Sequence, residues 1–228
     1  QTGKSTSTNT MGMREMQSRA FEARDAKYLL LKAPPASGKS RALMFLALDK
    51  MINQGIKKVI VAVPERSIGS SFSHTDLMKD GFFANWEPND NYNLCTPGDD
   101  GSSSKVQAFH NFMDSDEKIL ICTHATLRFA CDTLDETKLN DTLLAIDEFH
   151  HVSADGENRL GEVLRSLIEN SHKNATLKVL AKKEEPLMVY YDTLVKTIES
   201  SLPNGSSWIP ELVVVALLSE WIIEEEKS

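Results

Sequence analysis

The chain has 228 residues, of which 41% are hydrophobic and 25% are charged, a composition typical of a soluble globular protein with a sizeable core. No apolar run is long enough to span a membrane, no secretory signal is visible, and the three cysteines form no C-x-x-C pair, so we expect a cytoplasmic protein without a membrane partner. The net charge of -8 excludes a surface that is basic all over, although it permits a local basic cleft.

The first part of the chain alternates predicted helices with apolar strands. After residues 1–10, which we expect to be disordered, residues 11–27 have helical spacing and residues 28–32 form a short apolar run typical of a buried strand. A loop that contains glycine follows, and residues 41–53 are helix-forming. Residues 57–64, rich in Val and Ile, predict a second buried strand.

Three more strands are predicted further along. They lie at residues 118–124, 142–148 and 176–181, with helical patterns between them, while residues 87–104 are rich in loop-forming residue types. Strands that alternate with helices are typical of an α/β fold. We therefore predict a mostly parallel sheet, covered by helices on both faces, in a domain that spans residues 1–181.

The C-terminal part has a different pattern. Residues 185–202 and 209–227 look like two amphipathic or largely apolar helices, joined by a turn-like "PNGSS". We expect residues 182–228 to form a helical tail. Its apolar surface needs a cover, which is either an edge of the domain's own sheet or a partner.

The loop after the first strand is a candidate phosphate site. "APPASGKS" at residues 33–40 matches the phosphate-loop pattern except that Ala33 replaces the first glycine. In such loops, backbone N–H groups and a helix N-terminus converge on phosphate oxygens. The same Gly-Lys-Ser triplet occurs in "TGKS" at residues 2–5, which has no strand before it and is interpreted as a chance match. The residues predicted to bind ATP here are Pro35, Ala36, Ser37, Gly38, Lys39, Ser40 and Arg41.

Two adjacent carboxylates supply the partner that such a loop needs. Asp147 and Glu148 end the apolar strand in "LLAIDEFH", which suits one carboxylate for Mg²⁺ and one for the attacking water. An Asp-Glu pair after an apolar run is commonplace by itself, but together with the loop at Lys39 it predicts an NTPase. His150 and His151 belong to no H-E-x-x-H pattern, which argues against a metalloprotease.

Several motifs together resemble those of superfamily-two helicases, over a stretch from about Arg14 to Val179. "DEFH" resembles motif II of the DExH group, "APPASGKS" motif I, "MREMQ" an R-x-x-Q element, "VAVPERSI" motif Ia and "CTHATL" motif Ib. The set is most similar to the helicase subunits of type III restriction enzymes and to their DEAD/DEAH relatives. This resemblance implies a three-layer α/β/α P-loop NTPase domain of the RecA-like type, with ATP and Mg²⁺ as cofactors.

The resemblance also implies roles at the nucleotide. Lys39 would hold the β- and γ-phosphates, and Ser40 would bind Mg²⁺. Asp147 would hold the metal through water, and Glu148 would activate the hydrolytic water. His150 would couple the nucleotide site to nucleic acid.

Further roles concern the base and the polymer. Arg14 and Gln17 match the positions that contact adenine in the family. Arg66, Thr123 and Thr126 would touch the sugar-phosphate backbone, a contact that reads little sequence. The alternatives are a solvated helix-start arginine and two helix N-caps.

The sequence also departs from the family pattern. No Ser/Thr-rich motif III follows residues 176–181, and fewer than fifty residues remain, too few for the second RecA-like domain that brings an arginine finger. We therefore expect the first motor domain of a helicase or translocase, with weak hydrolysis and no unwinding by itself. It would need a second RecA-like domain or a partner subunit.

The leading hypothesis is an ATP-hydrolysing motor domain that is stimulated by nucleic acid, with DNA favoured over RNA. The alternative is a nucleotide-binding switch or interaction module with little or no turnover, which the missing motif III favours. A small-molecule kinase would need an acceptor pocket and lid arginines, and nothing in the sequence marks them.

Overall fold

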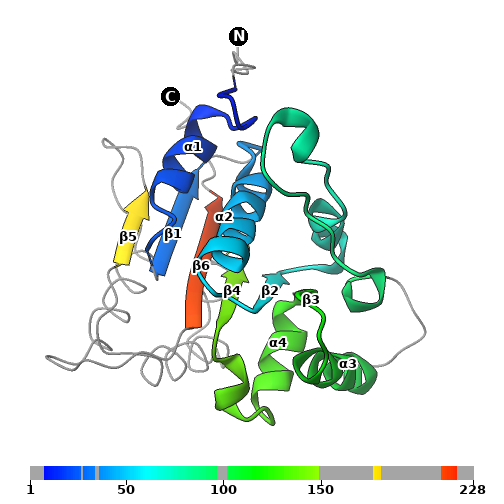
Figure 1. Cartoon of the computed structure of the whole chain (residues 1–228). Coiled ribbons are helices and arrows are strands. Elements are labelled where there is room, and N and C mark those ends of the chain that lie inside the picture. Colours follow the sequence, from blue (N-terminus) through cyan, green and yellow to red (C-terminus); the bar gives the residue numbers. More distant parts are fainter. Residues whose placement is uncertain are drawn as a thin grey trace, which may run out of the picture.

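The computed structural model describes residues 8–26, 28–33, 36–96, 102–148, 177–180 and 212–219. Its strands form one six-stranded sheet in the order β3-β2-β4-β6-β1-β5, and all neighbouring strands are parallel (Figure 1). The strands are β1 Tyr28–Ala33, β2 Lys58–Val63, β3 Ile119–Thr123, β4 Thr142–Ile146, β5 Leu177–Leu180 and β6 Leu212–Ser219. The α-helices are α1 Glu15–Glu22, α2 Lys39–Asn53, α3 Ser102–Asp114 and α4 His124–Cys131. Short 3-10 helices are η1 Arg66–Phe72, η2 Met78–Asp80, η3 Asp90–Tyr92 and η4 Glu136–Leu139.

Both faces of β2 are buried. Val59, Val61 and Val63 belong to the core cluster that includes α2, whereas Ile60 and Ala62, equally buried, alternate to the opposite face. Helix α4 contacts both β2 and β3. A sheet covered on both faces explains the continuous apolar runs in the sequence, and it confirms the predicted α/β class with a parallel sheet.

Helix α2 is the most deeply buried helix among the described residues. Leu43, Phe45, Leu46 and Ala47 on successive faces of the helix are all fully buried. The helix contacts β4 and η1 as well as α1, which packs along it (Figure 1). A helix that is enclosed in this way holds its first residue, Lys39, in a fixed place at the carboxyl end of β1.

The predicted helix at residues 209–227 is wrong over Leu212–Ser219, which form strand β6. This strand lies between β4 and β1, with Val214 in register with Leu144 on one side and Tyr28 on the other. Three consecutive valines favour a strand, and a central strand of a parallel sheet shows no polar alternation that distinguishes it from a buried helix. Residues 212–219 thus belong to the main sheet. The predicted helix at residues 185–202 lies outside the described residues.

Smaller differences concern element ends. Helix α1 is shorter than the predicted 11–27, and helix α3 begins inside the predicted 87–104 loop. Asn9, expected to be disordered, accepts hydrogen bonds from the backbone N–H groups of Met11 and Met13, both at 3.0 Å. Among the described residues, no helix has both the length and the apolar character needed to cross a membrane.

Candidate active site

The loop between β1 and α2 ends in a glycine that the fold requires. Gly38 caps the N-terminus of α2 with a φ of 91°, and a Cβ built there would lie 2.6 Å from Gln17 Nε2. Lys39, only 7% exposed, donates from Nζ to the Ala33 carbonyl at 3.0 Å. Because the first N–H groups of a helix have no partner within it, the start of α2 suits an anionic ligand.

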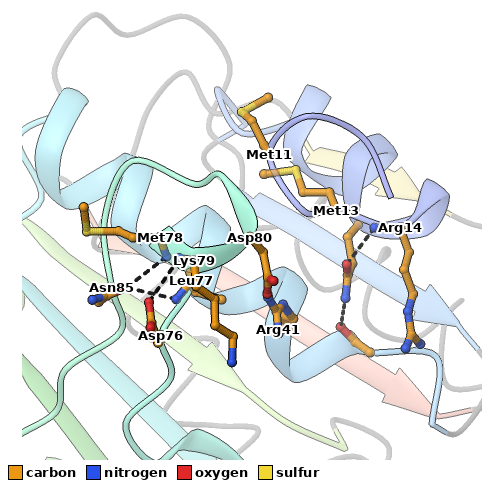
Figure 2. A network of polar contacts seen from close by, with 12 residues as sticks. Met11, Met13, Arg14, Arg41, Asp76, Leu77, Met78, Lys79, Asp80 and Asn85 are labelled. Atoms are coloured by element: carbon orange, nitrogen blue, oxygen red, sulfur yellow. Dashed lines mark hydrogen bonds and ion pairs between the residues drawn. The ribbon is translucent and has the colours of Figure 1, made fainter. Parts of the chain in front are cut away.

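Gln17 connects α1 to this loop. Its Oε1 accepts from the Arg14 backbone N–H at 2.9 Å, and its Nε2 donates to the Gly38 carbonyl at 3.1 Å. The two backbone groups fix the orientation of the amide, since one can only donate and the other can only accept. Figure 2 shows Arg14 on the α1 side of this connection. Gln17 is 2% exposed, and its hydrogen bond to the Gly38 carbonyl positions this glycine.

The two candidate carboxylates lie directly after β4. The Asp147 N–H donates to the Ala62 carbonyl at 2.8 Å, and Asp147 Oδ1 accepts from the Glu148 N–H at 3.0 Å. Asp147 is 5% exposed, and Glu148 has the left-handed φ of 48° that is uncommon for a residue with a side chain. The turn therefore ends the strand geometry, so the Asp147 and Glu148 side chains do not simply alternate as they would along a strand.

Lys39, Asp147 and Glu148 lie close enough for each charge to act on the others. Burial raises the pKa of Asp147 to about 6, helped by the Glu148 charge and opposed by the Glu148 N–H and the Lys39 ammonium. Burial lowers the pKa of Lys39, and the Glu148 and Asp147 charges oppose that shift. A buried carboxylate of raised pKa favours a bound cation, because the cation stabilises its ionised form.

His124 reaches this site from the neighbouring strands. Its Nε2 lies 2.9 Å from the Asp147 carbonyl oxygen, although His124 follows β3 and the sheet order sets β2 between β3 and β4. Within "CTHATL", no sequence pattern distinguishes this histidine. Only the strand order reveals that it lies beside Asp147.

The threonines on either side of His124 hold the start of α4. Thr123 is the N-cap, and its Oγ1 accepts from the Thr126 N–H at 3.2 Å and contacts the Thr126 hydroxyl at 3.0 Å. The alternative interpretation of Thr123 as an N-cap is therefore observed. Thr126 is buried and Thr123 is half-buried, so Thr123 is the more accessible of the two.

Arg66 lies at the start of η1, just after β2, and its side chain is exposed. Burial raises the pKa of the Cys95 thiol to about 11, and the charges of Lys105 and Arg66 oppose this shift.

Arg66 and Thr123 follow adjacent parallel strands, at the same edge of the sheet as Asp147. Ligands of such sheets bind at this edge.

The donor set fits a nucleotide with Mg²⁺. Ser40 and Asp147 carry the hard oxygen donors that Mg²⁺ prefers, with phosphates and water completing its shell. Ser37 Oγ is buried and has no hydrogen-bond partner among the described residues, which suits a polar ligand in the loop. Pro35 and His150, the remaining predicted site residues, lie outside the described residues.

Comparisons with known proteins agree with the motifs. The family model described as DEAD/DEAH box helicase matches residues 14–181. A protein of Bacillus subtilis (strain 168) named "Putative ATP-dependent helicase YeeB" is 65% identical over 171 residues, which are 75% of this chain and 28% of that protein. The solved structure of the Hef helicase domain of Pyrococcus furiosus is 13% identical, with a TM-score of 0.53. The match covers 90% of this chain and 38% of the Hef chain, and it shows the fold alone. The chain therefore belongs to the DEAD/DEAH box helicase family.

Proposed function

We propose that this chain binds and hydrolyses ATP as the first RecA-like motor domain of a nucleic-acid helicase or translocase. The observation that carries the proposal is the meeting of Lys39, at the start of α2, with Asp147 and Glu148 after β4. A cation at a helix N-terminus and a pair of carboxylates are what phosphoryl transfer from a nucleotide requires. The named helicase relative supports the same activity.

Each residue then has a part in hydrolysis. Lys39 binds the outer phosphates together with the N–H groups at the start of α2. Ser40 and Asp147 would hold Mg²⁺, which would neutralise phosphate charge when bound. Glu148 orients the attacking water and accepts its proton. Arg14 and Gln17 contact the adenine. Gln17 also holds Gly38 of the phosphate loop through a hydrogen bond.

Nucleic acid is the proposed partner, with DNA favoured over RNA. Arg66 is an exposed cation after β2, and Thr123 lies after β3, so a phosphate backbone that crosses this edge of the sheet meets both. Thr126 contributes through its contact with Thr123. The matched segment is 28% of the length of the Bacillus subtilis relative, so strand separation is proposed for a longer assembly with a second RecA-like domain. The likeness to type III restriction subunits and a cytoplasmic location belong to the same proposal.

The direct test is ATP turnover by the purified chain with and without single- and double-stranded DNA and RNA. We expect turnover that one polymer stimulates, and an effect that is sensitive to salt, because the contact is to phosphates. ATP binding without turnover under any condition would favour the switch module instead.

Among the described residues, His124 is a candidate for coupling nucleic-acid binding to ATP hydrolysis, because it contacts Asp147. Replacing it with alanine removes the hydrogen-bonding group beside the Asp147 carbonyl and should reduce nucleic-acid stimulation by on the order of tenfold. ATP affinity should change little, since the contact of the His124 ring is with the backbone carbonyl of Asp147 and leaves its carboxylate in place. The measurement is turnover against polymer concentration, with His110→Ala as a control on a histidine that pairs with Thr133. Unchanged stimulation would leave His150 as the predicted coupling residue.

A further inference from the structure

We propose that Asp80 is a positioning residue of the nucleotide site. Residues 73–86 form a loop, the 73–86 loop, that holds the Asp80 side chain in place. This inference rests on the proposed function. Asp80 forms an ion pair with Arg41, which follows Ser40 directly in the first turn of α2. Asp80 also lies against Gly12, two residues before Arg14. One carboxylate thus connects the phosphate side of the site to its adenine side.

The 73–86 loop is closed at its base. Thr75 and Trp86 exchange backbone hydrogen bonds of 2.9 and 3.0 Å in an isolated antiparallel bridge. The Trp86 side chain is fully buried, and its Nε1 donates to the Phe72 carbonyl at 2.7 Å. A buried tryptophan whose N–H is satisfied gives the loop a fixed anchor.

The tip of the loop is fixed by two polar side chains (Figure 2). Asn85 Oδ1 accepts from the backbone N–H groups of Leu77 and Met78, both at 2.9 Å. Asp76 Oδ1 accepts from the Lys79 N–H at 3.2 Å. These bonds set the course of η2, which ends at Asp80.

Aromatic packing attaches the loop to both helices of the site. Phe82, 3% exposed, lies edge-on to Phe21 of α1 and to Phe45 of α2, with ring centroids 5.8 and 4.6 Å away. Gly12, with a φ of 72°, leaves no space beside Asp80, because a Cβ built on Gly12 would lie 2.6 Å from Asp80 Cβ. The fit is close enough for the loop to fix where the carboxylate lies.

The ion pair itself has the character of a positioning contact. The side chains of Arg41 and Asp80 are 32% and 39% exposed, and an ion pair this accessible adds little to folding stability. Arg41 also lies over the Phe45 ring, at 5.7 Å from its centroid. Its Nε is buried and has no hydrogen-bond partner among the described residues. Figure 2 shows the two side chains directed toward one another.

The consequence concerns ATP affinity. With Asp80 in place, Arg41 and the segment before Arg14 are set before the nucleotide arrives, so binding has less side-chain freedom to remove. Without the carboxylate, the Arg41 guanidinium loses its fixed orientation. Affinity should fall, whereas the carboxylates at Asp147 and Glu148 keep their geometry.

The test compares Asp80→Asn with Asp76→Asn, which removes a charge from the same loop but keeps the Oδ1 that accepts from the Lys79 N–H. Binding of a fluorescent ATP analogue, KM, kcat and the thermal unfolding midpoint are measured for both. We expect Asp80→Asn to weaken ATP binding and raise KM by about three- to tenfold, with kcat within about twofold. Asp76→Asn should leave both values near those of the unsubstituted chain.

Two results would overturn the inference. Equal ATP affinity for Asp80→Asn and Asp76→Asn would show that the ion pair does not set the site. A fall in kcat and unfolding midpoint in proportion to affinity would assign Asp80 a structural role only. If the unsubstituted chain failed to bind ATP at all, the proposed function would fail first, which distinguishes the two.

Discussion

Replacing Glu148 with glutamine should lower the rate of ATP hydrolysis by about a thousandfold while leaving ATP binding nearly unchanged. Glutamine keeps the size of the side chain and the left-handed turn after Asp147, but its amide cannot accept the proton of the attacking water. Loss of the charge also lowers the pKa of Asp147, because Glu148 is one of the groups that raise it. Single-turnover hydrolysis and equilibrium binding of a fluorescent ATP analogue measure the two effects separately.

A matched control exists on the protein surface. Glu87→Gln changes an exposed glutamate that faces His74, and it should alter neither rate nor binding. If Glu148→Gln hydrolysed ATP at a rate close to that of the unsubstituted chain, Glu148 would not be the base. Parallel loss of binding and hydrolysis would instead assign Glu148 to holding the nucleotide.

The sequence predicts the strands near the site well because each is an uninterrupted apolar run with turn-forming or polar residues after it. The prediction of β4 followed by Asp147 and Glu148, and of β1 followed by the loop at Lys39, depends only on such local patterns. The joint interpretation remains a prediction, and it relies on the rule that parallel strands bring their carboxyl ends to one edge. Two local patterns thus suffice to bring Lys39 and Asp147 together.

The parts that could not be predicted depend on contacts between distant segments. β6 is predicted as a helix because no Gly, Pro, Asn or Asp ends its apolar run before residue 227, and only its place between β4 and β1 makes it a strand. His124 and Asp80 carry no motif. The first is identified by the order of β3, β2 and β4, and the second by a loop that folds back over α1 and α2.

Replacing Lys39 with alanine should weaken ATP binding by on the order of a hundredfold and reduce turnover further, because one charge-assisted contact to the phosphates is lost. The ammonium is held over the loop by the Ala33 carbonyl, which lies at the end of β1, and by the charges of Glu148 and Asp147. Its removal leaves the Ala33 carbonyl without this donor, at a cost of about 1–3 kcal/mol in the free energy of unfolding. Calorimetric titration with ATP and thermal unfolding measure the two losses.

The chain supplies its own control in the Gly-Lys-Ser triplet at residues 3–5. Lys4→Ala removes the lysine of this triplet and leaves the start of α2 unchanged, so ATP binding should be unaffected. A comparable loss of ATP binding in Lys4→Ala and Lys39→Ala would contradict the assignment of the site to the start of α2. Loss in Lys39→Ala alone would show that the triplet binds phosphate because β1 and α2 present it, since the residues themselves are the same in both places.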